Sequence, residues 1–160
     1  MSEVMKISVD RREKRIEVND QGDFIVLPVG NPEFVSTLMA LLKDFDAKAA
    51  QQRERAQEIQ KMPEDTTQET MERLTAAASF NLEISHDMAE RVNALFGKDA
   101  CLKVFGSNAP SLYMFADFFD QLTPYIRQFA EEEAQASQER IRKYSNKYTK
   151  KYHSADGASQ

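Results

Sequence analysis

Two Phe-Gly pairs constrain the fold of this chain more than any other feature of its sequence. Phe96-Gly97 and Phe105-Gly106 lie nine residues apart, and each glycine follows an apolar run. A glycine in that position closes a helix, because it readily adopts the left-handed backbone conformation just beyond the last helical residue. The spacing therefore predicts two helix ends in quick succession, with a short helix over Lys98–Phe105 between them.

A third helix is expected directly after this short one. Ser107-Asn108-Ala109-Pro110 provides its start, since proline is tolerated in a first helical turn. Pro124 lies inside the same helix and is expected to kink it. The apolar residues recur at steps that place them on one broad face, which needs a core or a partner to cover it: Leu112, Phe115, Phe118, Phe119, Leu122, Ile126 and Phe129.

Short strands are predicted before the helices. Met5–Val9 and Arg15–Val18 alternate apolar and polar residues, as half-buried strands do, and Phe24–Leu27 has the composition of a third strand. Asn19–Asp23 is typical of a turn, with Gly22 available for a positive φ. The result is a hairpin or meander of two or three strands, which needs helices against one face to be stable.

A first long helix is expected to begin at Asn31-Pro32, with asparagine as the N-cap and proline in the first turn. Its apolar face is formed by Phe34, Val35, Leu38, Leu41, Leu42 and Phe45. The polar, alanine-rich stretch Ala47–Gln60 should continue the helix by propensity alone. Met62-Pro63-Glu64-Asp65 is expected to end it.

A second long helix is predicted from the capping-box spacing of Thr66 and Glu69. The two long helices are expected to form an antiparallel hairpin. Its seam is longer than the neighbouring segments can cover, so we expect the chain to associate with itself. The seam consists of Met71, Leu74, Ala78, Leu82, Ser85, Met88, Val92 and Leu95.

The composition changes sharply beyond Phe129. Glu131–Glu133 is acidic, whereas residues 139–160 hold six basic and two acidic residues. Tyr144, Tyr148 and Tyr152 recur every four residues within this basic segment. Such a stripe can pack on a neighbouring helix, bind an acidic protein, or stack on nucleic-acid bases. We favour packing or a protein partner over nucleic acid, because the whole chain has a net charge of −5.

These features predict a mainly α fold, with a short N-terminal β-hairpin or meander and a long C-terminal helix. Residues 1–130 are expected to form the core domain, 131–153 a basic helical extension, and 154–160 a disordered tail. No apolar run in the sequence resembles a signal peptide or a membrane span. Cys101 is the single cysteine, which excludes an intrachain disulfide and is typical of a reducing compartment.

The sequence predicts no enzyme, no cofactor and no metal site. Cys101 has lysines but no histidine near it in sequence, so we interpret it as a small buried apolar thiol. His86 is expected on a helix surface or interface, and His153 near the frayed end. The carboxylates of Asp117, Asp120 and the Glu131–Glu133 run are interpreted as a solvated helix face. Phosphate-binding loops and nucleophile elbows are absent from the sequence.

Four phrases of the sequence resemble one known family. They are IEVNDQGDFIVLPVGNPEFV near the N-terminus and then LFGKDACLKVFG, PSL and FFDQLTPYI. Together they resemble the tail assembly chaperones of long-tailed phages that infect Gram-positive bacteria, and the likeness extends over most of the chain. The matched residues belong to the predicted hairpin, helix ends and core.

The resemblance implies a chaperone that coats the tape measure protein and keeps it soluble until the tube protein polymerises around it. The expected partners are then the tape measure protein, the tail tube protein and further copies of this chain. The expected location is the reducing cytoplasm of the host, and the mature virion should lack the protein. Two other classes remain: a structural virion protein, such as a tail completion or connector subunit, and a cytoplasmic helical adaptor with a basic C-terminal tail.

Three regions are expected to contact partners. Apolar side chains surround the first two turns of the third helix, which is more than one side of a small domain needs. The second helix has an uncovered seam, and the basic segment carries tyrosines. The residues predicted to bind partners are Met88, Val92, Leu112, Tyr113, Met114, Phe115, Phe119, Tyr144, Tyr148 and Tyr152.

Overall fold

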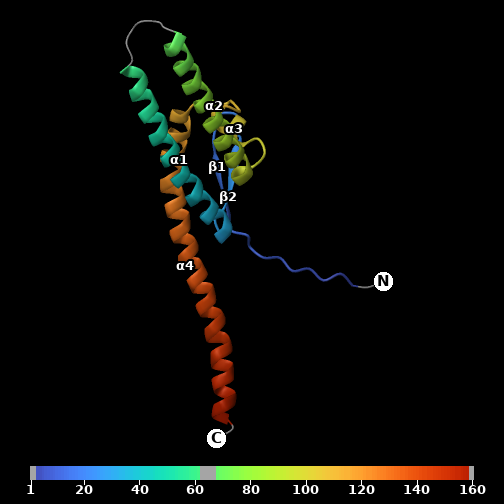
Figure 1. Cartoon of the computed structure of the whole chain (residues 1–160). Coiled ribbons are helices and arrows are strands. Elements are labelled where there is room, and N and C mark those ends of the chain that lie inside the picture. The colour runs from blue at the N-terminus through green and yellow to red at the C-terminus, as the bar shows by residue number, and fades with distance from the viewer. Residues whose placement is uncertain (1–2, 62–67, 159–160) are drawn as a thin grey trace.

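The computed structural model describes residues 3–61 and 68–158, and side chains as far as residue 148. Within these ranges, two strands are followed by four helices (Figure 1). The fold is mainly helical, with a two-stranded antiparallel hairpin near the N-terminus, as the sequence predicts.

The β-hairpin consists of β1 (Glu13–Glu17) and β2 (Phe24–Pro28), with Ile16 opposite Ile25. Gly22 in the connecting turn has a φ of +84°, which confirms the positive φ expected there. The Asn19 side chain closes this turn: its Oδ1 accepts hydrogen bonds from the backbone N–H groups of Gln21 and Asp23. Its Nδ2 donates to the Lys103 carbonyl 3.0 Å away, which ties the turn to the short third helix.

The predicted strand over Met5–Val9 is wrong. This segment is extended but unpaired, and its apolar side chains are exposed. An alternating pattern describes how side chains point along an extended backbone, but a strand also requires a neighbouring strand that supplies hydrogen bonds. Within the described residues the sheet contains only β1 and β2.

The two long helices, α1 (Pro32–Gln60) and α2 (Gln68–Phe96), run antiparallel to each other (Figure 1). The predicted cap of α1 is confirmed, because the backbone N–H of Glu33 donates to Asn31 Oδ1 over 3.0 Å. The predicted break at Met62–Asp65 and the predicted cap at Thr66 lie outside the described residues. The side chains of Phe34, Leu38, Leu41 and Phe45 are buried, as the helical spacing of α1 predicts.

The short helix α3 (Ala100–Phe105) lies between the two predicted glycine positions. Gly97 has a φ of +126° and Gly106 a φ of +69°, so both take conformations that favour glycine. The backbone N–H of Gly106 donates to the Leu102 carbonyl over 3.0 Å, as expected at a helix end. These two turns fold α3 back against the second half of α2.

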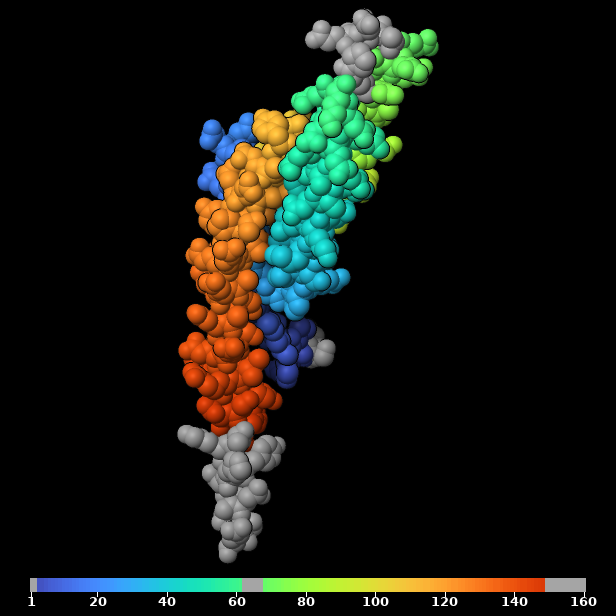
Figure 2. Space-filling model, turned by 60° about the vertical axis from the view of Figure 1, so that its left-hand side comes forward, coloured from blue at the N-terminus to red at the C-terminus, as the bar shows by residue number. Residues whose placement is uncertain are grey.

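The last helix, α4 (Leu112–Ala158), differs from its prediction at its start. Pro110 lies before the helix instead of in its first turn. It is buried, and its carbonyl accepts a hydrogen bond from the Ser85 hydroxyl over 2.7 Å. The backbone of α4 is helical as far as Ala158, and the disorder expected from Ser154 stays a prediction. The helix also continues through Pro124, and its second half projects beyond the rest of the molecule (Figure 2).

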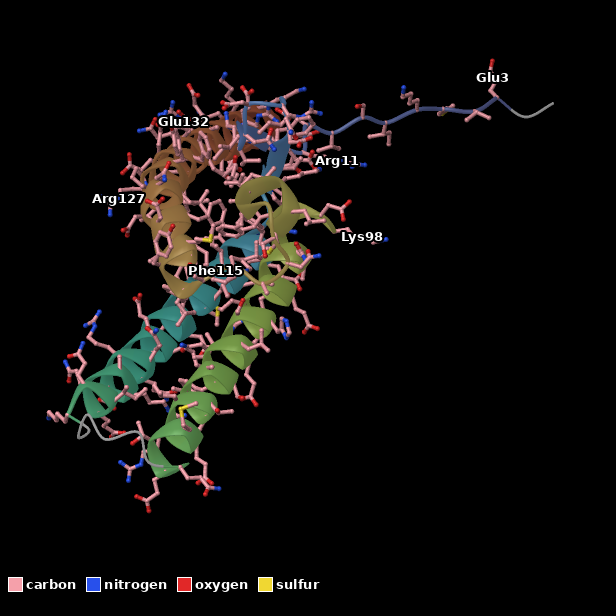
Figure 3. The ribbon with its side chains drawn as sticks, turned by 90° about the horizontal axis from the view of Figure 1, so that it is seen from above. Glu3, Arg11, Lys98, Phe115, Arg127 and Glu132 are labelled. Atoms are coloured by element: carbon pink, nitrogen blue, oxygen red, sulfur yellow. The ribbon has the colours of Figure 1, made fainter. Side chains whose placement is uncertain are left out.

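Phenylalanine side chains join the elements into one core. Phe115 of α4 is fully buried and contacts the rings of Phe45 in α1 and Phe105 in α3, with centroids 6.3 and 5.0 Å away (Figure 3). Phe96 of α2 contacts Phe34 of α1 at 5.8 Å. Because α1, α2 and α4 each contribute rings, these contacts hold the two antiparallel helices and α3 against the first half of α4.

Candidate partner-binding groove

An open groove of about 370 Å³ lies between β1, α3 and the first turns of α4. Most of its lining residues are apolar or aromatic, but its exposed surface is about evenly polar and apolar, and polar side chains are found at Glu17, Asp117 and Gln121. The apolar and aromatic residues that line it are Ile16, Val18, Val104, Phe105, Tyr113, Met114, Phe118, Leu122 and Tyr125. Binding sites commonly combine apolar side chains with a few polar groups, as this groove does.

Two of the predicted partner-binding residues line this groove. Tyr113 has 73% of its side chain exposed, and Met114 is half-buried. Leu112 is half-buried and packs against the core beside them. The structure therefore brings the predicted start of the third helix to a real concave surface. β1 forms the opposite wall. This role of β1 was not predicted, because the sequence does not indicate which helix the β-hairpin contacts.

Four other predicted residues lie inside the protein and do not belong to any surface of this fold. Met88, Val92 and Phe115 have no exposed area, and Phe119 is 5% exposed. The helical spacing placed them correctly on inward faces, but those faces are covered within the chain by α3 and by neighbouring helices. A partner cannot contact them unless the core opens.

The tyrosines of the basic segment lie on the projecting half of α4. Tyr144 and Tyr148 are exposed, and their ring centroids are 4.6 Å apart. Ile141, one turn before Tyr144, is also exposed. The rings contact each other and not a neighbouring helix of the described chain, so the predicted packing on a helix is not found here. The side chain of Tyr152 lies outside the described residues.

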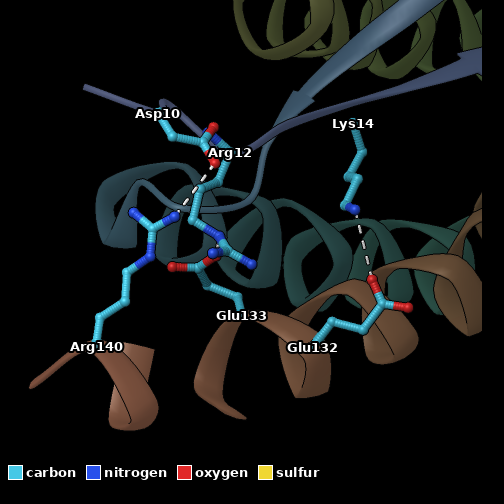
Figure 4. Close-up of polar contacts among 6 residues, drawn as sticks. All are labelled: Asp10, Arg12, Lys14, Glu132, Glu133 and Arg140. Carbon is cyan, nitrogen blue, oxygen red and sulfur yellow. Dashed lines mark hydrogen bonds and ion pairs between the residues drawn. The ribbon is translucent and has the colours of Figure 1, made fainter. Parts of the chain in front are cut away.

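Ion pairs connect the N-terminal segment to α4, and the sequence did not reveal them. Arg12 forms an ion pair with Glu133, and Lys14 Nζ lies 3.5 Å from Glu132 Oε2 (Figure 4). Glu132 and Glu133 were interpreted as part of a solvated face. Glu132 is exposed, as this predicts, whereas Glu133 is half-buried and the interpretation is wrong for it. The signal was present as a basic run at Arg11–Lys14 and an acidic run at Glu131–Glu133, but their proximity depends on the tertiary fold.

Cys101 is a buried core thiol, as predicted. Its Sγ–H donates to the Ala89 carbonyl over 3.5 Å, and its backbone N–H donates to Asn93 Oδ1. Burial raises the pKa of the Cys101 thiol to about 11. The nucleophilic thiolate is therefore a minor species at neutral pH, and nothing in this environment activates it.

The described part of the chain holds no group of three or more histidine, cysteine, aspartate or glutamate side chains arranged to bind a metal ion. In the same ranges, no helix carries the sustained apolar run that a bilayer crossing requires. His86 is exposed on α2.

The chain matches no family model, no curated protein and no solved structure.

Proposed function

We propose that this protein is a tail assembly chaperone, which binds apolar segments of a phage tape measure protein and keeps them soluble before the tail tube forms. The resemblance of its sequence to that family supports the proposal. The observation that carries it is the open groove between β1, α3 and α4, which exposes apolar and aromatic side chains and has Tyr113 and Met114 on its wall. A chaperone of this kind needs an exposed apolar surface on an otherwise charged molecule.

The side chains of the groove suit a client whose sequence varies along its length. Met114 is unbranched and adapts its shape to different partners. Tyr113 and Tyr125 are both exposed and combine an apolar ring with a polar hydroxyl, so they can contact apolar or polar residues. The carboxylates of Glu17 and Asp117 keep the groove hydrated when it is empty and can pair with basic residues that flank an apolar client segment.

Co-expression with the tape measure protein tests this function. Changing Tyr113→Ser together with Met114→Ser removes apolar area from the groove, and the client should then precipitate. Circular dichroism should show that the doubly changed protein remains helical. Met39→Ser with Met71→Ser is the matched control, because both methionines are exposed on α1 and α2 away from the groove. This control should keep the client in solution.

Two results would contradict the proposal. If the groove variant holds the client in solution as well as the original protein does, the groove is not the binding surface. If purified phage particles contain this protein as a regular component, the structural virion class is favoured, since a chaperone leaves before the particle is complete. Mass spectrometry of purified particles distinguishes the two classes.

A further inference from the structure

The N-terminal arm, residues 3–12, is the least covered part of the described chain. It is extended and projects away from the body, as the positions of Glu3 and Arg11 show (Figures 1 and 3). Met5, Ile7 and Val9 point to one side of this extended backbone and are 89%, 91% and 74% exposed. Lys6 and Ser8 lie on the other side. A soluble chain rarely leaves such an alternating apolar strand in water unless a partner covers it.

The base of the arm is fixed by contacts to the body. Arg12 has a φ of +55°, an uncommon value for a residue with a side chain, and its N–H donates to Asp10 Oδ1 over 3.0 Å. Arg12 also pairs with Glu133, and Asp10 lies 3.7 Å from Arg140 (Figure 4). A Cβ on Gly30 would lie 3.1 Å from the Arg11 carbonyl oxygen, so glycine permits this close passage. These contacts direct the arm away from its own sheet.

The sheet has a free edge beside the groove. β1 pairs only with β2 among the described residues. The Lys14 side chain lies near Glu132 and Phe129, so the face of β1 that carries Lys14 and Ile16 borders α4. Val18 N–H donates to the Asp23 carbonyl, so the residues of β1 that alternate with Val18 bond to β2. The backbone groups of Glu13, Arg15 and Glu17 therefore point to the free edge, above the groove lined by Ile16 and Val18.

We propose that the arm of one copy adds as a strand to the free edge of β1 in a second copy and covers its groove. The register places Ile7 opposite Ile16, so that the backbone groups of Lys6 and Ser8 bond to the free edge of β1. When the strands pair, Met5, Ile7 and Val9 share the inner face with Ile16 and fill the groove. Lys6 then lies on the outer face beside the exposed carboxylate of Glu17, and Arg15 on the same face stacks over Phe24 of β2.

This arrangement also regulates client binding, and that part rests on the proposed function. The arm of a neighbour and an apolar client segment occupy the same groove, so each must displace the other. In copies without a client, the arm of a neighbour covers the apolar side chains of the groove, and this reduces aggregation. The contact between copies itself does not depend on which client binds, so it is tested with purified protein alone.

The first experiment measures the assembly state by sedimentation velocity at roughly tens of micromolar protein, where weak interfaces of this kind are populated. The original protein should sediment as dimers or larger species, and Met5→Ser, Ile7→Ser and Val9→Ser together should reduce it to the monomer. Val4→Ser is the matched control, because Val4 is equally exposed but lies on the opposite side of the arm. An original protein that is monomeric, or a triple variant that assembles unchanged, would overturn the proposal.

The second experiment asks whether the arm of one copy meets the groove of another. A donor carries an intact arm and the groove substitution Met114→Glu, and an acceptor carries the three serine changes and an intact groove. Each should be monomeric alone, and their mixture should form a one-to-one complex. A mixture without a complex contradicts the contact, as does hydrogen exchange that shows protected Met5–Val9 amides in a monomer, since the arm would then pair with its own β1. Neither experiment measures client binding, which the co-expression assay tests separately.

Discussion

The α1–α2 hairpin has a closed half and an open half, and the two differ in packing although their sequences are similarly helical. In the closed half, Leu38 and Leu41 of α1 meet Met88 and Val92 of α2, and none of the four has exposed area. The chain folds α3 and the first half of α4 over this end. The comparison shows that a second layer, more than helix propensity, decides where these helices are stable.

In the open half the two helices stand alone. Met71, Leu74 and Leu82 of α2 are each between 43% and 56% exposed. An open space of about 920 Å³ separates the helices near Arg55 and Arg73, and it is lined mostly by charged residues and alanines. Two helices with so few apolar contacts gain little from pairing, so this half should open at a lower free energy than the closed half.

The largest predicted effect compares the methionines at the two ends of α2. Met88→Ala removes a fully buried side chain from the closed half and leaves a cavity, which should lower the free energy of unfolding by about 2–5 kcal/mol. Met71→Ala, in the open half, should change it by less than about 0.5 kcal/mol because the side chain is already 56% exposed. Urea denaturation measures both, and similar costs would show that the two halves are equally packed.

The second prediction uses the thiol of Cys101, which α3 buries against the closed half. Because burial raises its pKa to about 11, the folded thiol stays protonated at pH values where the unfolded thiol, with a pKa near ~8.5, ionises. Between these values the unfolded state binds fewer protons. Stability should then fall as pH rises, by about 1.4 kcal/mol per pH unit.

Cys101→Ala isolates this contribution, since every other titrating group is common to both proteins. The stability of the original protein relative to the variant should be constant below about pH 8. It should decline from there towards pH 11. Denaturation midpoints at several pH values give the difference, and a flat difference across the window would show that solvent reaches the thiol in the folded state.

The third prediction concerns the glycines that bring α3 over the closed half. An added Cβ at Gly97 or Gly106 would meet no atom within 4 Å, so the cost of alanine is conformational. Gly106→Ala should cost about 1–2 kcal/mol because of its left-handed backbone. Gly97, with a φ of +126°, should cost more, about 1–3 kcal/mol. Asn108→Ala, at an exposed neighbouring position, is the control. Unchanged melting temperatures in both glycine variants would refute the assignment.

The sequence predicts which face of each element points inward but not what covers that face. The seam from Met71 to Leu95 was expected as one continuous strip, yet only the part from Ser85 onward is covered. The apolar periodicity is a local property of the sequence, whereas the burial of a helix face depends on where α3 packs in the folded chain. The same reason explains the arm: Met5–Val9 has the alternation of a strand, but alternation carries no information about the presence of a neighbour.

The candidate groove was predictable only on one side. Tyr113 and Met114 were predicted because apolar residues surround the start of α4, and that excess is visible in the sequence. Ile16 and Val18 on the other wall depend on how the β-hairpin docks. The buried Ile25 and Leu27 join it to the core, and the Lys14–Glu132 and Arg12–Glu133 pairs connect it to α4. Such pairs join positions more than a hundred residues apart, and opposite charges alone do not indicate which of many carboxylates a cation meets.

The smallest predicted effect concerns two interactions between α1 and α2, one in each half of their hairpin. Arg91 lies 2.5 Å from Asp44 in the closed half, and the Arg55 guanidinium lies 3.8 Å from the centre of the Phe80 ring in the open half. Each pair, taken alone, should contribute about 0.5–1 kcal/mol, the range for partly exposed pairs. Double-mutant cycles with alanine measure each coupling energy in global unfolding.

The two couplings should nevertheless differ, because only interactions that persist until the whole protein unfolds contribute to its global stability. If the open half separates first, Arg55 and Phe80 are already apart when the core unfolds, and their global coupling should fall below about 0.3 kcal/mol. Hydrogen exchange of amides near Phe80 should still slow when this pair is intact. The Arg91–Asp44 coupling should keep its full size and weaken with added salt, since part of it is a screened charge interaction. Equal global couplings for both pairs would mean that the hairpin unfolds as one unit and that its open half is as stable as its closed half.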